Sequence, residues 1–445
     1  LLCMICLQTQ LPAQKIGCGA FHNVMICNST AANSWGFNDH GMLGDSSFIV
    51  NSNVPVSVST LNGIRAISCA WENTIALRND STVWCWGRND VGQLGTGNFV
   101  DSRVPVQLSA LSGITAVAGA GYHSLALKND ATVVAWGNNL SGQLGNGSNS
   151  NSNVPVAVNS LTGIVAIAGG GDHSLALKNN GTVWGFGDNI YGQLGNGNNS
   201  NSNIPVQTSS LSNVVAIAGG YFHSMALKSD STVWTWGRND FGQLGNGSNS
   251  YSTVPVQVTG LTGIKKIEAG QFFSIALKSD GTVWAFGFNA QGQLGNGNNT
   301  SSNLPVQVSG IGNITDIYAG GNHAIAVKND GTVWSWGWNQ YGQLGNGNNT
   351  DSNVPVQVTG GCQILAAQTA WVAKPNAISI YPNPSSENIF ILNLPDFENT
   401  GYEVYNVYGQ KMSAGLLREN SISVKDFSAG LYFVSLKTKS GNYYE

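Results

Sequence analysis

Charged residues are scarce in this chain: Asp, Glu, Lys and Arg account for 9% of its 445 residues, whereas about a quarter is usual in globular proteins. The net charge is −4, and no run of Lys or Arg forms a basic stripe. Nucleic-acid-binding proteins hold phosphates with such stripes. The composition therefore predicts that nucleic acid is not a partner.

Long apolar runs are also missing. Nowhere does the sequence approach the roughly 20 apolar residues that a membrane-spanning helix needs. The short run LLCMICLQTQLPAQ at residues 1–14 is typical of the end of a secretory signal peptide. We interpret residues 1–13 as a signal-peptide remnant that is cleaved after Ala13 and whose basic start is missing; an ordinary first strand is the alternative. We expect no membrane span.

Cysteine is sparse. Without Cys3 and Cys6 of the predicted signal, five cysteines remain, an odd number without zinc-ligand spacing, so neither a disulfide framework nor a metal site is predicted. These are Cys18, Cys27, Cys69, Cys85 and Cys362. We interpret Cys18, Cys69 and Cys85 as small core residues, with a single bridge between early repeats as the alternative.

Catalytic signatures are absent as well. The sequence holds no GxSxG elbow, no HExxH motif and no matched Cys and His pair. Its GNG blocks join strands and open no helix, so they are not phosphate cradles. Four loop carboxylates lack an evident partner acid or base: Asp39, Asp90, Asp188 and Asp240. We predict no catalytic residue, no cofactor and no bound metal.

The chain has instead a repeat of 50 residues. A GQLG block opens successive copies at Gly92, Gly142, Gly192, Gly242, Gly292 and Gly342, and a degenerate GMLG at Gly41 opens the first. A period of about 20 to 50 residues marks solenoids, propellers and arrays, whose units bury their apolar faces only against neighbours. The repeat therefore predicts a modular fold of seven units.

One copy shows what each unit forms. Val165–Ala168 is β-branched and apolar, His173–Lys178 alternates, and Asn179–Gly181 has the chemistry of a tight hairpin turn. Thr182–Phe186 and Ile204–Gln207 complete four short strands without any helical period. Four strands per unit are typical of a propeller blade. The sequence predicts an all-β, seven-bladed β-propeller.

Aromatic and imidazole side chains recur at fixed positions of the repeat. One position holds Trp35, Trp86, Trp136, Phe186, Trp236, Phe286 and Trp336, and another holds His22, His123, His173, His223 and His323. We interpret the rings as packing between blades. A catalytic histidine is not needed five times, and Asn73 and Phe273 replace it in two copies, so we expect structural imidazoles that open a strand.

Proline also keeps one position. It holds Pro55, Pro105, Pro155, Pro205, Pro255, Pro305 and Pro355. Because proline cannot donate to a strand ladder, this position predicts the start of an outer or edge strand. For ring closure we predict that Lys15–Cys18 supplies the fourth strand of the unit ending at Val354–Val358, with Ile364–Ala367 as a weaker competitor.

The aligned copies read AGGxxHSLALKxDGTVWxWGxNxxGQLGNG. This pattern is very similar to the repeat of the regulator of chromosome condensation family. The resemblance implies a seven-bladed β-propeller, in a family that includes a guanine nucleotide exchange factor and secreted bacterial propellers such as β-lactamase inhibitors. The exchange factor uses an inserted hairpin and a basic tail, whereas the spacing from Gly92 to Gly342 is uniform here and no basic tail exists. An exchange-type regulator of a small GTPase is the alternative function.

After Ala377 the repeat stops and alternating apolar residues indicate a small immunoglobulin-like β-sandwich. This part resembles the type IX secretion system carboxy-terminal sorting domain, and the matching residues are Tyr381, Pro382, Asn383, Pro384, Asp426, Gly430, Tyr432 and Phe433. A plain immunoglobulin-like stalk is the alternative. We predict a propeller at 14–362, a linker at 363–377 and a sorting domain at 378–445 that is truncated at its end. The resemblance implies export by the type IX machinery to the outside of the cell or its surface.

The copies differ most in the loops before the histidine position and after Trp-Gly, which strand parity places on one face. Variable aromatic loops on a constant scaffold are typical of binding surfaces. The candidate ligand-binding residues are Phe21, Phe37, Trp71, Arg88, Tyr122, Asp172, Tyr191, Tyr221, Phe222, Arg238, Phe241, Phe272, Phe288, Trp338 and Tyr341. Drift at solvated loop positions is the alternative.

Together these patterns predict a secreted or cell-surface, non-enzymatic binding protein, monomeric as a propeller, whose loop face binds a protein or glycan. A structural adhesin module without a discrete ligand is a further alternative.

Overall fold

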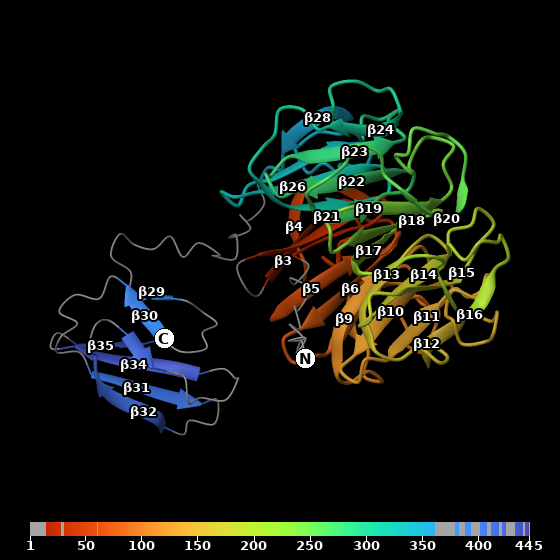
Figure 1. The fold of residues 1–445 in the computed structure, drawn as a ribbon. Coiled ribbons are helices and arrows are strands. Elements are labelled where there is room, and N and C mark those ends of the chain that lie inside the picture. Colours follow the sequence, from red (N-terminus) through yellow and green to blue (C-terminus); the bar gives the residue numbers. More distant parts are fainter. Residues whose placement is uncertain are drawn as a thin grey trace. The chain divides into compact units, whose positions relative to one another are not determined.

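A computed structural model describes residues 15–27, 31–59 and 61–360, and in the carboxy-terminal part residues 379–381, 388–392, 401–406, 411–417, 421–423, 432–438 and 441–444. The chain divides into two compact units, Leu1–Ala366 and Ala367–Glu445 (Figure 1). The predicted signal remnant and linker lie outside the described residues, and the predicted domain boundaries stay predictions.

The first unit contains seven antiparallel sheets of four strands each, which confirms the predicted all-β, seven-bladed propeller. Blade 1 contains β1 (Ile16–Cys18), β2 (His22–Cys27), β3 (Ala31–Phe37) and β4 (Asn51–Ser57). Blade 2 contains β5 (Ile64–Cys69), β6 (Asn73–Arg78), β7 (Val83–Gly87) and β8 (Ser102–Gln107). Blade 3 contains β9 (Ile114–Gly119), β10 (His123–Lys128), β11 (Val133–Gly137) and β12 (Ser152–Ala157). Blade 4 contains β13 (Ile164–Gly169), β14 (His173–Lys178), β15 (Val183–Gly187) and β16 (Ser202–Gln207). Blade 5 contains β17 (Val214–Gly219), β18 (His223–Lys228), β19 (Val233–Gly237) and β20 (Ser252–Gln257). Blade 6 contains β21 (Ile264–Ala269), β22 (Phe273–Lys278), β23 (Val283–Gly287) and β24 (Ser302–Gln307). Blade 7 contains β25 (Ile314–Ala319), β26 (His323–Lys328), β27 (Val333–Gly337) and β28 (Ser352–Gln357).

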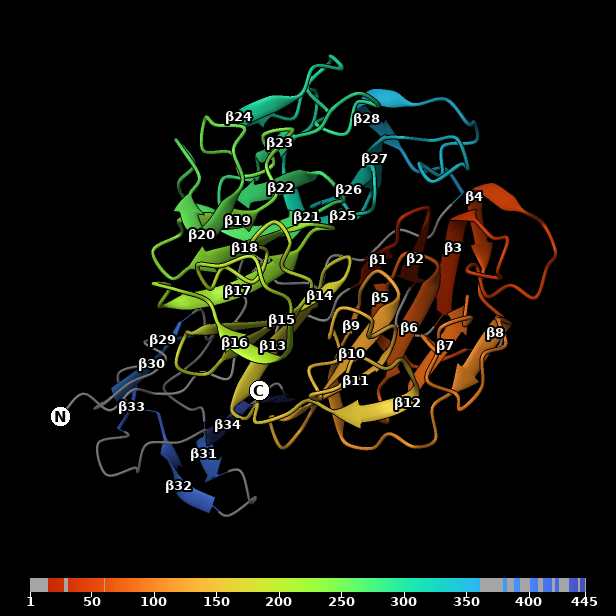
Figure 2. The same ribbon diagram turned by 90° about the vertical axis from the view of Figure 1, so that its right-hand side faces the viewer.

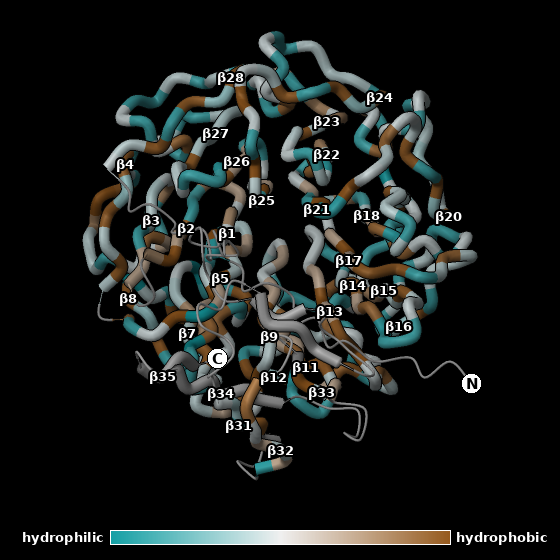
Figure 3. Tube along the Cα trace, turned by 60° about the vertical axis from the view of Figure 1, so that its left-hand side comes forward, coloured by the Kyte–Doolittle hydropathy of each residue, from teal (hydrophilic) through white to brown (hydrophobic). Residues whose placement is uncertain are grey.

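Within each blade the strands follow one another in sequence order from the axis of the ring to its rim (Figure 3). The innermost strands are β1, β5, β9, β13, β17, β21 and β25. Since neighbouring strands are antiparallel, the connections of a blade alternate between the two faces of the ring.

The predicted closure of the ring is wrong. β1 pairs with β2 of its own blade, with Ile16 opposite Met25, and β28 is already the fourth strand of blade 7. Each described sheet of the propeller is therefore complete within one repeat, and among the described strands none is shared between blades 1 and 7. Blades 1 and 7 lie side by side (Figure 2) and share one apolar cluster that includes Ile16, Trp35 and Tyr318. The other predicted competitor, Ile364–Ala367, lies outside the described residues.

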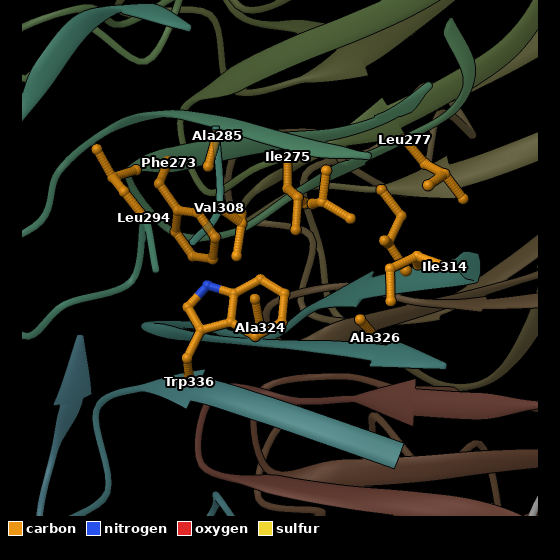
Figure 4. Close-up of a cluster of buried hydrophobic side chains, with 12 residues drawn as sticks. Phe273, Ile275, Leu277, Ala285, Leu294, Val308, Ile314, Ala324, Ala326 and Trp336 are labelled. Carbon is orange, nitrogen blue, oxygen red and sulfur yellow. The ribbon is translucent and has the colours of Figure 1, made fainter. Parts of the chain in front are cut away.

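Apolar clusters fill the spaces between adjacent blades, and the recurrent large ring lies in each. Figure 4 shows Trp336 of blade 7 packed against Phe273 and Val308 of blade 6. All seven rings at this position are fully buried: Trp35, Trp86, Trp136, Phe186, Trp236, Phe286 and Trp336. Trp136 Nε1 also donates a hydrogen bond to the Gln93 carbonyl of the preceding blade at 2.9 Å. The predicted packing role of these rings is confirmed.

The recurrent proline lies in the outermost strand, as predicted, but in its middle and not at its start. Pro155 is the fourth residue of β12 (Ser152–Ala157), where the ladder shifts register between Ala135 and Gly137 of the partner strand. At a bulge on an edge strand no ladder hydrogen bond is needed from this residue, so the N–H that proline lacks costs no stability.

Cys18, Cys69 and Cys85 are free thiols, so no disulfide joins any two of these three.

The second unit contains two antiparallel sheets, β29-β30-β33 and β32-β31-β34-β35. Their strands are β29 (Ser379–Tyr381), β30 (Asn388–Leu392), β31 (Gly401–Asn406), β32 (Lys411–Leu416), β33 (Ser421–Ser423), β34 (Tyr432–Thr438) and β35 (Gly441–Tyr444). Its β character is as expected, and the immunoglobulin-like classification stays a prediction. Of the predicted sorting residues, Tyr381 ends β29 and Tyr432 and Phe433 begin β34, while Pro382, Asn383, Pro384, Asp426 and Gly430 lie outside the described residues.

Candidate functional site

Two variable positions meet in every blade. The backbone N–H of the residue after Trp-Gly donates to the carbonyl of the residue before the histidine position, as Asn138 does to Tyr122 at 2.9 Å. The glycine between them makes this approach possible: Gly137 has a φ of 103°, and a Cβ there would lie 2.6 Å from the Tyr122 oxygen. We call the side of the propeller that carries these positions the loop face.

Asparagine side chains that recur in each copy of the repeat hold the long connection between the third and fourth strands. Asn139 is fully buried; its Oδ1 accepts from Leu144 N at 2.9 Å, and its Nδ2 donates to the carbonyls of Ser148 and Ser150 at 2.9 and 3.0 Å. The same pattern recurs in the other GQLG copies at Asn89, Asn189, Asn239, Asn289 and Asn339. These loops are therefore folded around a neutral side chain, and the residues at their surface are positioned in advance.

One group of rings lies where blade 7 meets blade 1. The Phe21 ring contacts Trp338 edge to face at a centroid distance of 5.6 Å and Tyr341 at 5.9 Å. Phe37 and Tyr341 lie 4.5 Å apart. We call these four side chains the seam cluster. All four are half-buried, so each ring is held by its neighbours and keeps part of its surface open.

A second group spans blades 4 to 6 and surrounds one arginine. The Arg238 guanidinium lies 4.9 Å from the Tyr191 ring, 5.3 Å from Phe222 and 5.2 Å from Phe272. Phe241 and Phe288 extend the group, with ring centroids 4.8 Å apart. We call these five rings and Arg238 the arginine cluster. Cations over ring faces are attracted by the ring quadrupole, so the arginine holds the rings together.

Near the axis, a stack joins blades that are far apart in the ring. Trp71 of blade 2 and Tyr221 of blade 5 stack at 4.4 Å with planes 12° apart. Tyr122 meets Trp71 edge to face at 5.4 Å, and Tyr221 contacts Phe222 of the arginine cluster at 4.2 Å. We call Trp71, Tyr122 and Tyr221 the central stack. It extends the aromatic surface across the axis of the ring.

Polar side chains occupy the variable positions of blades 2 and 4. Arg88 forms ion pairs with Glu72 and Asp90 and lies 5.3 Å from the Tyr122 ring. In blade 4, Asp172 accepts from Gln143 Nε2 at 3.0 Å and Asp188 from Gln193 Nε2 at 2.8 Å. Burial, and then the charge of Asp188, raise the pKa of Asp172, and burial raises the pKa of Asp188.

All fifteen candidate residues thus lie on one face, and all are half-buried. The list of candidate ligand-binding residues leaves out Glu72 and Asp188, although both occupy variable positions of the same loops. Aligned copies contain the signal for both, because each occupies one of the two variable positions. The contact between Trp71 and Tyr221 carries no local signal, since 150 residues separate them.

A further departure from the repeat, on the innermost strands, was missed. Where β13 has Ala166 and Ala168, β21 has Lys266 and Glu268. Lys266 Nζ lies 3.2 Å from Glu268 Oε1 and 2.5 Å from Asp316 Oδ1 of blade 7. These charges satisfy one another, so we interpret them as a link between blades 6 and 7.

The recurrent histidines are fully buried. Each Nε2 bonds to a side chain of the next blade, as His123 does to Ser174 Oγ at 2.8 Å. Burial lowers the pKa of His22, His123, His173, His223 and His323 to about 3. Neutral, inaccessible imidazoles of this kind are structural, as predicted. The part of the chain with described coordinates contains no group of three or more His, Cys, Asp or Glu that could hold a metal.

A ring of seven blades, with constant turns on one face and variable loops on the other, defines the first unit as a repeat propeller. Residues 4–313 match the RCC1-like domain, and residues 314–343 and 330–365 match regulator of chromosome condensation (RCC1) repeats. The chain belongs to the RCC1-like domain family.

Solved structures agree on the fold. Human WBSCR16 is 25% identical with a TM-score of 0.68, covering 75% of this chain and 94% of that one. Yeast RCC1 (Prp20), solved bound to Kap60, is 23% identical with a TM-score of 0.69, covering 84% and 88%.

Sequence relatives match over short segments. The human probable E3 ubiquitin-protein ligase HERC6 is 38% identical over 84 residues, 18% of this chain and 8% of HERC6. The Arabidopsis thaliana ultraviolet-B receptor UVR8 is 37% identical over 90 residues, 19% of this chain and 20% of UVR8. The match therefore spans a fifth or less of these relatives' length.

Residues 379–445 match the secretion system C-terminal sorting domain. This domain directs type IX secretion, so the protein is exported to the outer surface or the extracellular space, as predicted. No helix of the described residues has the length and apolar character to cross a membrane.

Proposed function

We propose that the propeller is a non-enzymatic binding module, carried outside the cell by its sorting domain, that recognises a protein or surface glycan through the loop face. The observation that carries this proposal is the gathering of half-buried rings and arginines from all seven blades on one face. Trp, Tyr and Arg dominate the energetics of binding interfaces. Rings that already contact one another lose little entropy when a partner orders them, which favours affinity.

The opposite face supports this assignment by contrast. There the hairpin turns repeat one short polar design, in which Asp130 Oδ1 accepts from Thr132 N and Oγ1 at 3.1 and 2.6 Å. The design returns at Asp80, Asn180, Asp230, Asp280 and Asp330. A face that repeats itself offers little to distinguish one ligand from another, whereas the loop face differs in every blade.

The test replaces one ring in each part of the surface: Trp71→Ala and Tyr122→Ala in the central stack, Phe222→Ala in the arginine cluster and Trp338→Ala in the seam cluster. The full chain captures extracellular proteins of the producing cells, or glycans on an array, and bound species are counted. We expect the fourfold variant to lose capture while its melting temperature stays within a few degrees, because these rings lie outside the cores between blades.

Tyr251→Ala is the matched control, since this ring is 55% exposed but belongs to none of the three groups; it should leave capture unchanged. Equal capture by the fourfold variant would refute the loop face as the binding surface. No capture by the unaltered protein would favour the structural adhesin without a discrete ligand.

A further inference from the structure

Two parts of the loop face already show how a guanidinium is held there. Arg88 lies over the Tyr122 ring at 5.3 Å and pairs with Asp90 at 2.6 Å. Arg238 lies over Phe222 and pairs with Asp240, also at 2.6 Å. Each arginine is the residue after Trp-Gly in its blade. Rings, a carboxylate and an arginine thus form a closed unit in blades 2 and 5.

Blade 4 has the carboxylates without the arginine. The position after Trp-Gly is Asp188 here, and Asp172 stands before the histidine. Neither carboxylate has a Lys, Arg or His nitrogen within 4.0 Å among the described side chains. Asp172 Oδ1 accepts from Gln143, while its Oδ2 has no hydrogen bond within the described part of the chain. Two like charges therefore lie together and uncompensated.

Backbone hydrogen bonds join the loop that carries Asp172 to the loops of Tyr122 and Tyr221. Gly121 N, beside Tyr122, donates to the carbonyl of Gly171 at 3.1 Å, and Gly171 N donates to the carbonyl of Tyr221 at 3.1 Å. The loop of Asp172 thus lies between the loops that carry the two tyrosines of the central stack. Burial raises the pKa of both phenols, and the charge of Asp172 adds to this rise. Burial, and then the charge of Asp172, raise the pKa of Tyr221 to about 12, so the ring stays neutral and keeps a negative face for a cation.

We propose that this part of blade 4 is the receptor for a basic side chain of a protein partner, with Asp172 Oδ2 accepting its hydrogen bond and Tyr122 and Tyr221 flanking its cation. The inference rests on the proposed function and names the chemistry of the partner. Asp188 is 6% exposed and adds negative potential behind Asp172 without touching the ligand. Arginine fits better than lysine, because its planar group can stack on a ring and donate in the ring plane.

The experiment uses the full chain and three tripeptides, acetyl-Gly-Arg-Gly-amide and its lysine and citrulline counterparts, in calorimetric or NMR titrations. Citrulline keeps the shape of arginine and removes the charge. We expect binding of the arginine peptide, weaker binding of the lysine peptide and none of the citrulline peptide. Asp172→Asn should weaken arginine binding by at least about tenfold, as loss of a charge-assisted hydrogen bond implies.

The repeat supplies the evidence that Asp172→Asn folds. Blade 7 has Asn322 at this position, where it accepts from Gln293 Nε2 at 3.3 Å, so the bond to Gln143 is retained. Asp280→Asn on the opposite face is the control for net charge, because Asn180 fills that position in blade 4; it should not change binding.

Equal binding of the arginine and citrulline peptides, no binding of either, or an unaffected Asp172→Asn variant would each overturn the inference. A response to CaCl2 without a response to arginine would do the same and would point to a cation site. If the arginine peptide does not bind but the fourfold ring variant still loses capture, this inference fails and the proposed function stands. The peptide titration and the capture assay therefore test the two proposals separately.

Discussion

At the residue scale, one serine joins each of blades 3 to 6 to its predecessor. Ser174 Oγ donates to the Gln143 carbonyl at 2.8 Å, which uses its only proton, so His123 Nε2 must supply the proton of their shared hydrogen bond. His123 Nδ1 is left as a buried atom without a partner. The imidazole is therefore fixed in one neutral tautomer by the blade that follows it.

One departure from this pattern is a matched pair across an interface, whereas Asn73 replaces the histidine of blade 2 while blade 3 keeps Ser124. Phe273 replaces the histidine in blade 6, and the serine position of the next blade is Ala324; the two side chains pack in one apolar cluster. At the closure of the ring, Asn23 replaces the serine. Its Oδ1 lies 2.7 Å from His323 Nε2, and its Nδ2 donates to the Gln343 carbonyl at 2.8 Å. Asparagine thus makes with two atoms the two bonds that the serine hydroxyl makes with one.

This pairing predicts a coupled pair of substitutions, His173→Phe and Ser224→Ala, which together copy the interface of blades 6 and 7. Ser224→Ala alone leaves the His173 N–H buried without an acceptor and should lower the free energy of unfolding by about 1 to 3 kcal/mol. The double variant should lose about 1 kcal/mol less than the sum of the single variants. Urea denaturation of all four proteins measures the coupling, and simple additivity would contradict the paired role.

At the element scale, the hairpin turns share one left-handed backbone conformation, but only some of them have glycine at the left-handed position. Gly181, Gly281 and Gly331 adopt φ values of 77°, 82° and 82°, and Ala131 and Ser231 adopt 61° and 64° at the same position. The turn bond is the same in both kinds, 2.9 Å for Gly181 and 3.0 Å for Ala131. A left-handed backbone costs a residue with a Cβ about 1 to 2 kcal/mol. The non-glycine turns are therefore strained.

Ala131→Gly should raise the free energy of unfolding by about 0.5 to 1 kcal/mol, since the relief of strain exceeds the greater chain entropy of glycine. Gly181→Ala is the reciprocal variant and should destabilise by a similar amount. Both are read from urea or thermal denaturation. A destabilising Ala131→Gly would show that the alanine side chain contributes contacts that outweigh the backbone strain.

The elements were predictable because each repeats seven times, so turn chemistry and alternation reinforce one another. Three features were not. In a circular repeat the sequence does not mark which strand is the first of a blade. Lys15–Cys18 was therefore assigned to the last blade, whereas β1 is the first strand of blade 1. The bulge at the proline position depends on the partner strand. The stack of Trp71 on Tyr221 requires the closed ring, which no local pattern contains.

At the scale of the whole molecule, side-chain and backbone hydrogen bonds join blade 7 to blade 1, whose described strands form separate sheets. Besides Asn23, the Trp35 Nε1 group donates to the Gln343 carbonyl at 2.9 Å, and Gly321 N donates to the Gly19 carbonyl at 3.1 Å. The joint thus uses the same bonds as the other interfaces, with asparagine in place of serine. Five of the seven interfaces contain a buried histidine bond, so the histidines are distributed around the ring.

That distribution makes the fold sensitive to acid. Burial lowers the pKa of five histidines from 6.5 to about 3, so below 6.5 the unfolded chain binds protons that the folded chain does not. Stability is fully present above the ordinary pKa and falls as the pH drops toward 3, by about 1.4 kcal/mol per pH unit for each histidine. We expect a steep loss of stability between about pH 6 and pH 4.5, with an uptake of nearly five protons on unfolding.

Hydrogen bonds lower the pKa of the hairpin carboxylates, such as Asp130 to about 2, so their contribution is lost only below their ordinary value of 3.8 and lies outside this window. Urea denaturation from pH 7.5 to 4.5 gives the proton uptake from its slope. The double variant His173→Phe with Ser224→Ala provides the control, because it removes one titrating group and keeps a packed interface. Its uptake should be lower by about one proton. An uptake equal to that of the unaltered protein would mean that the histidines become protonated in the folded ring, which their burial and the donor role of Nε2 argue against.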